Sequence, residues 1–324
     1  MRWKRIILWI SVALAALITT AVAVLYLAFP KVRPAPVLTA PNDAATVARG
    51  EYIVKSVSLC LGCHSGMSEA PGRPLEDDGR LGAGKVMAAW EGLPGRVVAP
   101  NLTPDRETGL GAWTDGEIVR ALREGISRDG RPLFPYMPYD LYAKALSDAD
   151  ALAVVAYLRT LKPIKNELPK TSLDFPLPLI VRTMPEPLAT PAPAVPTELV
   201  ARGQTLLKLC ACGACHDTND STHSAIPGME LAGGEPFNLP SGTVHAPNIT
   251  SDPETGIGKF TDEQIIAAID SGRSLRRPNS LIWGMPWALY AGMTADDKRA
   301  IVAALRASKP VKHVVPVDPE PRMK

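Results

Sequence analysis

The run Cys60-Leu61-Gly62-Cys63-His64 occurs a second time in kind, as Cys212-Gly213-Ala214-Cys215-His216. A Cys-x-x-Cys-His run is the attachment signature of c-type haem: both thiols form thioether bonds, and the histidine takes one axial position on iron. A structural zinc site would need further ligands at each run, and the chain has only three other histidines. We therefore expect two covalently attached haem c groups. The expected attachment residues are Cys60, Cys63, Cys212 and Cys215, and the expected histidine ligands are His64 and His216.

Each run begins a copy of a longer pattern, so the chain contains an internal repeat. The segment Ala99-Pro100-Asn101-Leu102-Thr103 is matched downstream by Ala246-Pro247-Asn248-Ile249-Thr250. Met137-Pro138-Tyr139 is matched in the same order by Met285-Pro286-Trp287. The order of motifs predicts two versions of one domain joined by a linker. The expected boundaries are 44–163 for the first domain, 164–197 for the linker, 198–312 for the second domain and 313–324 for a polar tail.

A methionine stands at the same place in both copies. Met137 lies 73 residues after His64, and Met285 lies 69 residues after His216. A single methionine is usually a filler of core gaps. Its recurrence among divergent neighbours instead favours a role as the second axial ligand, where a thioether stabilises ferrous iron and raises the reduction potential. We predict the iron ligands Met137 and Met285.

The N-terminus predicts a membrane segment. Ile6 to Phe29 is a run of 24 uncharged, mostly apolar residues, and about 20 such residues cross a bilayer as a helix. Arg2, Lys4 and Arg5 precede the run, which favours a cytoplasmic N-terminus. A cleaved signal peptide is the alternative, but its apolar region is normally only about 7–15 residues long. We expect residues 1–30 to form a single-pass anchor in the inner (cytoplasmic) membrane, with the haem domains on the periplasmic side.

The rest of the chain reads as helical, with short helices before the haem motifs at 44–57 and 198–209. Thr114 and Thr261 each begin a capping box, the pattern that opens a helix. The final helix of each copy is expected to begin at Ser147 and at Thr294. Alternating strands are absent, apart from possible short pairings within 84–99 and 233–245. The fold class is therefore all-α, with tandem cytochrome c-like domains preceded by one N-terminal transmembrane helix.

Three further features have an expected role. Eight prolines between Ile164 and Pro196 favour an extended strap without regular helix. Asn101 and Asn248 either donate hydrogen bonds to haem propionates or shape their turns. Cys210 is the one cysteine outside the two motifs, so no disulfide framework is expected. It could be a free thiol, a competing point of haem attachment or a residue without functional effect, and we expect the last.

The full pattern resembles the multihaem cytochrome c subunits of bacterial membrane-bound dehydrogenases for alcohols, gluconate and aldehydes. The resemblance covers roughly residues 45–163 and 198–312, including the loops around Ala-Pro-Asn-Ile-Thr and Met-Pro-Trp. It implies the same four haem thioethers and the axial pairs His64/Met137 and His216/Met285. Two departures stand out. Those subunits typically hold three haem domains where this chain holds two, and the anchor here is N-terminal.

These features predict an electron carrier and not an enzyme in its own right. Electrons would come from a dehydrogenase subunit and pass to quinone, a soluble cytochrome or a terminal oxidase. The alternative is a dihaem cytochrome c peroxidase, which needs an open distal position on one haem. A net charge of +2 without a lysine and arginine stripe gives no support to nucleic-acid binding.

Overall fold

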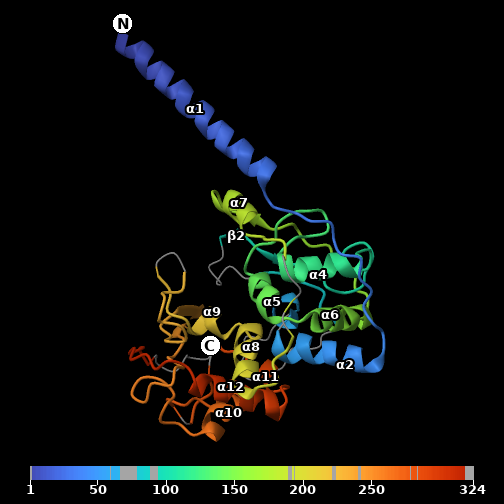
Figure 1. Ribbon diagram of the computed structural model, residues 1–324, viewed down its shortest axis with the longest axis vertical. Coiled ribbons are helices and arrows are strands. Elements are labelled where there is room, and N and C mark those ends of the chain that lie inside the picture. The colour runs from blue at the N-terminus through green and yellow to red at the C-terminus, as the bar shows by residue number, and fades with distance from the viewer. Residues whose placement is uncertain are drawn as a thin grey trace.

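The computed structural model shows a mostly helical body from which one long helix projects (Figure 1). The first and second copies of the motif pattern, called here the first repeat (44–163) and the second repeat (198–312), form two adjacent groups of helices. The structure describes residues 2–58, 60–65, 79–87, 94–188, 192, 194–220, 224–239, 242–277, 279–282 and 284–317.

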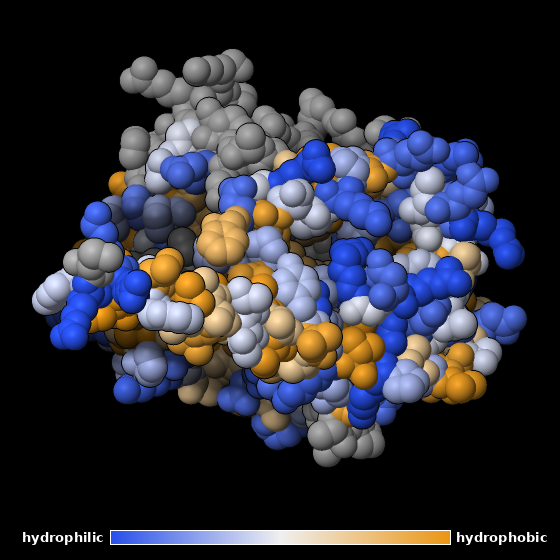
Figure 2. All heavy atoms as spheres, turned by 90° about the horizontal axis from the view of Figure 1, so that it is seen from above, coloured by the Kyte–Doolittle hydropathy of each residue, from blue (hydrophilic) through white to orange (hydrophobic). Residues whose placement is uncertain are grey.

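The projecting helix is α1, Arg2–Ala28, and none of its residues is buried. Among the described residues it is the one helix long and apolar enough to cross a membrane. Viewed from the end at which α1 projects, hydrophobic side chains form a band across the face with hydrophilic ones around it (Figure 2). Within α1 itself, the large apolar side chains from Trp3 to Leu27 that are exposed have exposed fractions of 49–89%. This exposure is unusual for a helix of a water-soluble body and is typical of a segment that contacts another apolar phase.

The two repeats contain corresponding helices in the same order. The first repeat holds α2 (Ala44–Tyr52), the π-helical turn η1 (Ile53–Val57), α3 (Cys60–His64), α4 (Asp115–Glu124), α5 (Tyr139–Ala145) and α6 (Asp148–Thr160). The second repeat holds α8 (Leu199–Leu209), α9 (Cys212–His216), α10 (Asp262–Ser271), α11 (Trp287–Tyr290) and α12 (Ala295–Arg306). Thr114 and Thr261 form the expected capping boxes, and the Ser147 and Thr294 side chains cap α6 and α12.

A glycine lets the first and last helices of each repeat touch. A Cβ atom on Gly50 would lie 1.8 Å from the carbonyl oxygen of Ala153 in α6. The equivalent atom on Gly203 would lie 1.9 Å from the carbonyl oxygen of Ala300 in α12. No side chain fits at such distances, so only glycine permits this backbone approach.

Each helix crossing also carries an ion pair. Arg49 in α2 donates two hydrogen bonds of 2.8 Å to Asp150 in α6. At the matching position, Arg202 in α8 pairs with Asp297 in α12, with 2.6 Å between Nη2 and Oδ1. Asp150 and Asp297 are buried, and a buried carboxylate without a partner would be strongly destabilising. The two arginines supply the opposite charge.

Short strands lie where pairings were thought possible, and one pair lies elsewhere. The expected regions hold β1 (Lys85–Val86) with β3 (Val98–Ala99), and β5 (Pro236–Leu239) with β6 (Gly242–His245). In addition, β2 (Gly95–Arg96) pairs with β4 (Ser172–Leu173), which ties the linker to the first repeat.

The expectation that the proline-rich linker lacks regular helix was wrong at one point. The linker forms α7 (Leu177–Ile180) and the 3-10 turn η3 (Val181–Thr183). Pro178 lies in the first turn of α7, where a backbone N–H has no partner within the helix, so proline costs little there.

The start of the expected tail is also packed: Val315 is buried, and His313 Nδ1 lies 2.9 Å from the carbonyl oxygen of Ala232. Residues 318–324 of that tail lie outside the described residues.

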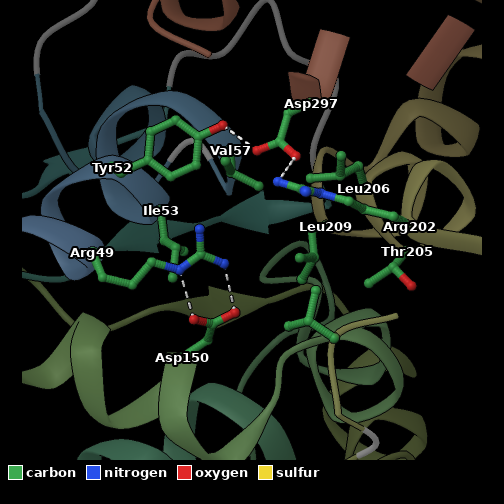
Figure 3. Close-up of a pocket in the computed structure, with 11 residues that line it drawn as sticks. Arg49, Tyr52, Ile53, Val57, Asp150, Arg202, Thr205, Leu206, Leu209 and Asp297 are labelled. Atoms are coloured by element: carbon green, nitrogen blue, oxygen red, sulfur yellow. Dashed lines mark hydrogen bonds and ion pairs between the residues drawn. The ribbon is translucent and has the colours of Figure 1, made fainter. Parts of the chain in front are cut away.

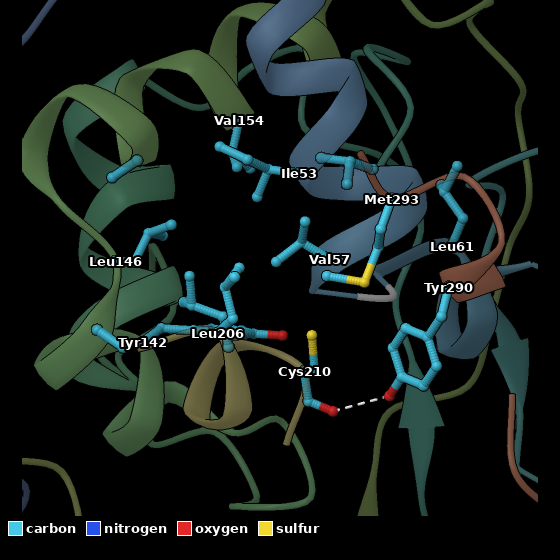
Figure 4. Close-up of a cluster of buried hydrophobic side chains, with 14 of the residues drawn as sticks. Ile53, Val57, Leu61, Tyr142, Leu146, Val154, Leu206, Cys210, Tyr290 and Met293 are labelled. Atoms are coloured by element: carbon cyan, nitrogen blue, oxygen red, sulfur yellow. Dashed lines mark hydrogen bonds between the residues drawn. The ribbon is translucent and has the colours of Figure 1, made fainter. Parts of the chain in front are cut away.

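The two repeats share one continuous hydrophobic core (Figure 4). Side chains of η1 and α3 from the first repeat meet side chains of α8 and the segment after α11 from the second. The labelled members are Ile53, Val57, Leu61, Tyr142, Leu146, Val154, Leu206, Cys210, Tyr290 and Met293. The two repeats therefore pack directly against each other, in addition to being joined by the linker.

Candidate cofactor-binding sites

A cavity in the second repeat brings together side chains that are far apart in the sequence. It has a volume of about 660 Å³, including its open mouth. Cys212, Cys215 and His216 line it together with Met285. The remaining wall is almost entirely apolar and includes Leu207, Ile257, Ile265, Ile269, Ile301 and Leu305. An apolar cavity with a few polar or ligating groups is the usual form of a cofactor site.

The donor set of this cavity fits a haem. Two thiols and an imidazole come from the single turn α9, and a thioether comes from the segment before α11. Thiols for covalent attachment, a histidine ligand and a methionine ligand are the groups that a c-type haem uses. An apolar wall would keep water from the iron and so help to set its potential.

Both motif histidines are held in the same orientation by a proline carbonyl. His64 Nδ1 lies 2.7 Å from the oxygen of Pro100, and His216 Nδ1 lies 2.8 Å from the oxygen of Pro247. A carbonyl only accepts, so Nδ1 carries the hydrogen and Nε2 is left as the ligand atom, which is the usual support for a metal-binding histidine. Pro100 and Pro247 belong to the matched Ala-Pro-Asn segments. The sequence did not predict that their carbonyls would bind the histidines.

Burial also keeps these histidines neutral. It lowers the pKa of His64 to about 4, and it lowers the pKa of His216 from its ordinary value. In both cases the hydrogen bond to proline opposes the effect of burial but does not overcome it. Neutral imidazole is the form that coordinates a metal, so each site holds its histidine ready for that role at neutral pH.

The corresponding residues of the first site stand on matching elements of the first repeat. His64 and Leu61 are buried, and Cys60 and Met137 pack against the same core cluster. Met137 lies two residues before α5, as Met285 lies two residues before α11. The structure therefore places both predicted methionines at the start of equivalent helices.

Two tyrosines that were not anticipated connect each methionine segment to its haem motif. Tyr142 donates a 2.9 Å hydrogen bond to the carbonyl of Ser58, and Tyr290 donates one of 2.9 Å to the carbonyl of Cys210. Each accepting residue lies two positions before the first motif cysteine. The signal was present in the sequence, because each tyrosine stands five residues after its methionine.

Asn101 and Asn248 use their side-chain amides to shape their loops and to bind the segment that follows the last helix of each repeat. Asn101 Nδ2 donates to the carbonyl of Ile164 at 2.7 Å, and Asn248 Nδ2 donates to that of Val311 at 2.8 Å. Their side-chain oxygens accept from the backbone of Thr103 and Thr250. Both asparagines are buried, so the structure favours the turn-shaping role over donation to a propionate.

The chain is similar in sequence to several cytochromes and cytochrome subunits. No family model matches the chain. Over 250 residues it is 30% identical to a diheme cytochrome c-type protein of Cereibacter sphaeroides, covering 74% of this chain and 79% of that protein. It is 31% identical over 267 residues to the fructose dehydrogenase cytochrome subunit of Gluconobacter japonicus, covering 79% of this chain and 51% of that subunit.

A third relative is the cytochrome c subunit of the quinone alcohol dehydrogenase of Gluconobacter oxydans, 30% identical over 282 residues. That alignment covers 82% of this chain and 55% of the subunit. The chain thus spans about half the length of the dehydrogenase subunits that it matches. The fold and the site define a haem-binding protein of the cytochrome c class. The chain belongs to the c-type cytochrome family that contains these relatives.

Proposed function

We propose that this protein is a membrane-anchored dihaem cytochrome c with tandem haem domains, residues 44–163 and 198–312. It carries electrons from a dehydrogenase subunit to a quinone, a soluble cytochrome or a terminal oxidase. The haem domains face the periplasm, and α1 holds them to the inner membrane. Three observations support this function: the thiol, imidazole and thioether groups that line the cavity, the exposed apolar helix α1, and the cytochrome class of the relatives.

The observation that carries the proposal is the cavity shared by Cys212, Cys215, His216 and Met285. The two cysteines would attach one haem covalently, and the histidine and methionine would be its axial ligands. Cys60, Cys63, His64 and Met137 would hold the other haem in the same way. A bound haem supplies a one-electron iron couple.

The protein itself supplies a fixed and dry setting. The proline carbonyls orient the histidines, Tyr142 and Tyr290 fix the motif turns, and the apolar walls exclude water. A histidine and a methionine that both bound the iron would leave no position on it for a substrate, so the arrangement suits electron transfer and not turnover of a small molecule.

The partner is proposed from the relatives. Several are named as cytochrome subunits of dehydrogenases for fructose, alcohol or gluconate. We infer a dehydrogenase as the electron donor of this chain as well. Arg2, Lys4 and Arg5 at the start of α1 favour an N-terminus in the cytoplasm, which puts the body on the opposite side.

The test begins with the full-length protein purified from membranes. Haem content per chain should be two, and the ferric spectra should show methionine ligation at both haems. Peroxide turnover should be absent. One haem per chain would contradict the dihaem assignment. An open axial position together with peroxide turnover would favour the peroxidase alternative. A dehydrogenase that purifies with the protein from mild detergent would identify the donor.

A further inference from the structure

Exposed apolar side chains gather on the linker segment 175–184, which contains α7 and η3. The exposed fraction is 83% for Phe175 and 46% for both Ile180 and Met184. Ile180 ends α7, and Met184 follows the 3-10 turn η3, so both exposed side chains belong to one short helical stretch. Val181 in the same stretch is only 4% exposed. The segment therefore combines one buried apolar side chain with three exposed ones.

This segment is fixed to the last turn of α1. Arg182 Nη2 donates a 3.0 Å hydrogen bond to the carbonyl of Tyr26 and a second bond to the carbonyl of Phe29. The guanidinium carbon of Arg182 lies 4.5 Å from the centre of the Tyr26 ring. These contacts satisfy carbonyls at the helix end that have no partner within α1. Figure 1 shows α7 at the edge of the body from which α1 leaves.

The length of α1 sets the level of this contact relative to a bilayer. The hydrocarbon core is about 30 Å thick, which about 20 helical residues span. The charged residues of α1 end at Arg5, so a core that begins at Ile6 ends close to Leu25. Tyr26 then falls at the interface, where tyrosines are enriched. Arg182 holds segment 175–184 at this same level.

We propose that segment 175–184 is a second membrane contact, in which Phe175, Ile180 and Met184 enter the interfacial layer of the bilayer that α1 crosses. The partner is a lipid surface. The argument rests on the proposed anchoring by α1 and on the direct continuity of the exposed face with the end of that helix. With two contacts, the first repeat keeps one face toward the membrane.

The test uses the full-length protein in vesicles of phosphatidylethanolamine and phosphatidylglycerol that contain a lipid with a photoreactive diazirine in its acyl chain. After irradiation, lipid adducts are mapped on peptides by mass spectrometry. Adducts are expected on α1 and on the peptide that contains residues 175–184. Val314 is the matched control, since its side chain is 76% exposed but lies in the tail that follows the second repeat, and it should carry none.

Variants separate this contact from the anchor. Phe175→Asp combined with Ile180→Asp should lower the adducts on the segment severalfold, because a carboxylate is disfavoured among acyl chains, and should leave those on α1 unchanged. Val314→Asp should change neither, and haem absorbance checks folding. Adducts on α1 alone in the parent protein would overturn the proposal and assign the apolar face to a protein partner. Absence of adducts from α1 as well would overturn the anchoring itself.

Discussion

At the residue scale, the pairing of each histidine with a proline carbonyl determines which nitrogen faces the cavity. The carbonyls of Pro100 and Pro247 fix Nδ1 as the donor, and the same residue type performs this role in both repeats. On a bound haem, the opposite axial position would then be open to Met137 or Met285, which stand just before α5 and α11. The methionine assignments are therefore the ones most open to a direct test.

Met285→His should lower the reduction potential of one haem and leave its covalent attachment intact. A second imidazole stabilises ferric iron where the thioether stabilised ferrous iron. Axial ligands and their surroundings span about 0.8 V among haem proteins, so we expect a change on the order of 0.1 V. A redox titration followed by absorbance measures it. Met137→His should do the same to the other haem, and Met184→His on the exposed linker should do nothing. An unchanged titration would refute the axial assignment.

Cys210→Ser should leave two haems per chain. Cys210 occupies the position that Ser58 holds in the first repeat, since each lies two residues before the first motif cysteine. Ser58 Oγ donates to the carbonyl of Ile53 at 2.9 Å, and serine at position 210 would have the Leu206 carbonyl within the same turn. Haem content of the purified variant checks this. A drop to one haem would show that the Cys210 thiol takes part in haem attachment.

Tyr52 connects the repeats through a polar contact that has its own pH dependence. Its hydroxyl donates to the buried Asp297 carboxylate, and burial, followed by this bond, raises the pKa of Tyr52 from 10.0 to about 12 (Figure 3). A folded-state pKa above the unfolded value gives stability that is complete below pH 10 and is lost as the pH rises toward 12.

Tyr52→Phe should lower the free energy of unfolding at neutral pH by about 1–2 kcal/mol, because Asp297 loses a partner. It should also flatten the fall in stability between pH 10 and pH 12, the interval between the two pKa values. Denaturant titrations at several pH values measure both effects. Tyr26→Phe is the control, since its contact with Arg182 is through the ring and not the hydroxyl. Equal slopes for wild type and Tyr52→Phe would mean that this hydroxyl does not titrate as described.

At the element scale, the close crossing of the first and last helices gives each repeat its frame. The sequence predicted these helices and their caps well, because Thr114, Thr261, Ser147 and Thr294 carry local signals that need no tertiary context. It could not predict the pairing of β2 with β4, since two-residue strands far apart in the chain leave no periodic pattern. The helix α7 was missed for a related reason: a four-residue helix with a proline in its first turn also leaves no periodic pattern.

Gly203→Ala should be strongly destabilising. The added methyl group would lie 1.9 Å from the Ala300 carbonyl oxygen and 2.7 Å from the Ala304 side chain, so α8 and α12 would have to separate. We expect a loss of about 3 kcal/mol or more in the free energy of unfolding, at the upper end for overpacked positions. The control is Ala201→Gly in the same helix, which should cost only about 1 kcal/mol through helix propensity. Similar losses for both variants would contradict the close crossing.

At the scale of the whole molecule, the repeats are joined by a shared core and by a polar cluster. The cavity in Figure 3 is lined by Arg49 and Asp150 from the first repeat and by Arg202 and Asp297 from the second. Tyr52 crosses from one ion pair to the other by its bond to Asp297. Sequence patterns indicated the repeat but not the contact between its two copies, because the packing of two surfaces depends on their shapes and not on a local motif.

A shared core implies that the repeats lose structure together. The slowest-exchanging backbone amides of α6 and α12 should therefore report the same free energy of opening in native-state hydrogen exchange. Leu206 belongs to α8, yet it lines the cavity between the repeats together with Tyr52 and Ile53. Leu206→Ala should lower the opening free energy of both helices by about 2–5 kcal/mol, through lost burial and a new void. Val314→Ala, at an exposed site, should change neither helix. If α12 weakened while α6 kept its protection, the repeats would be independent folding units, and the contact between them would position their haems without contributing to either fold.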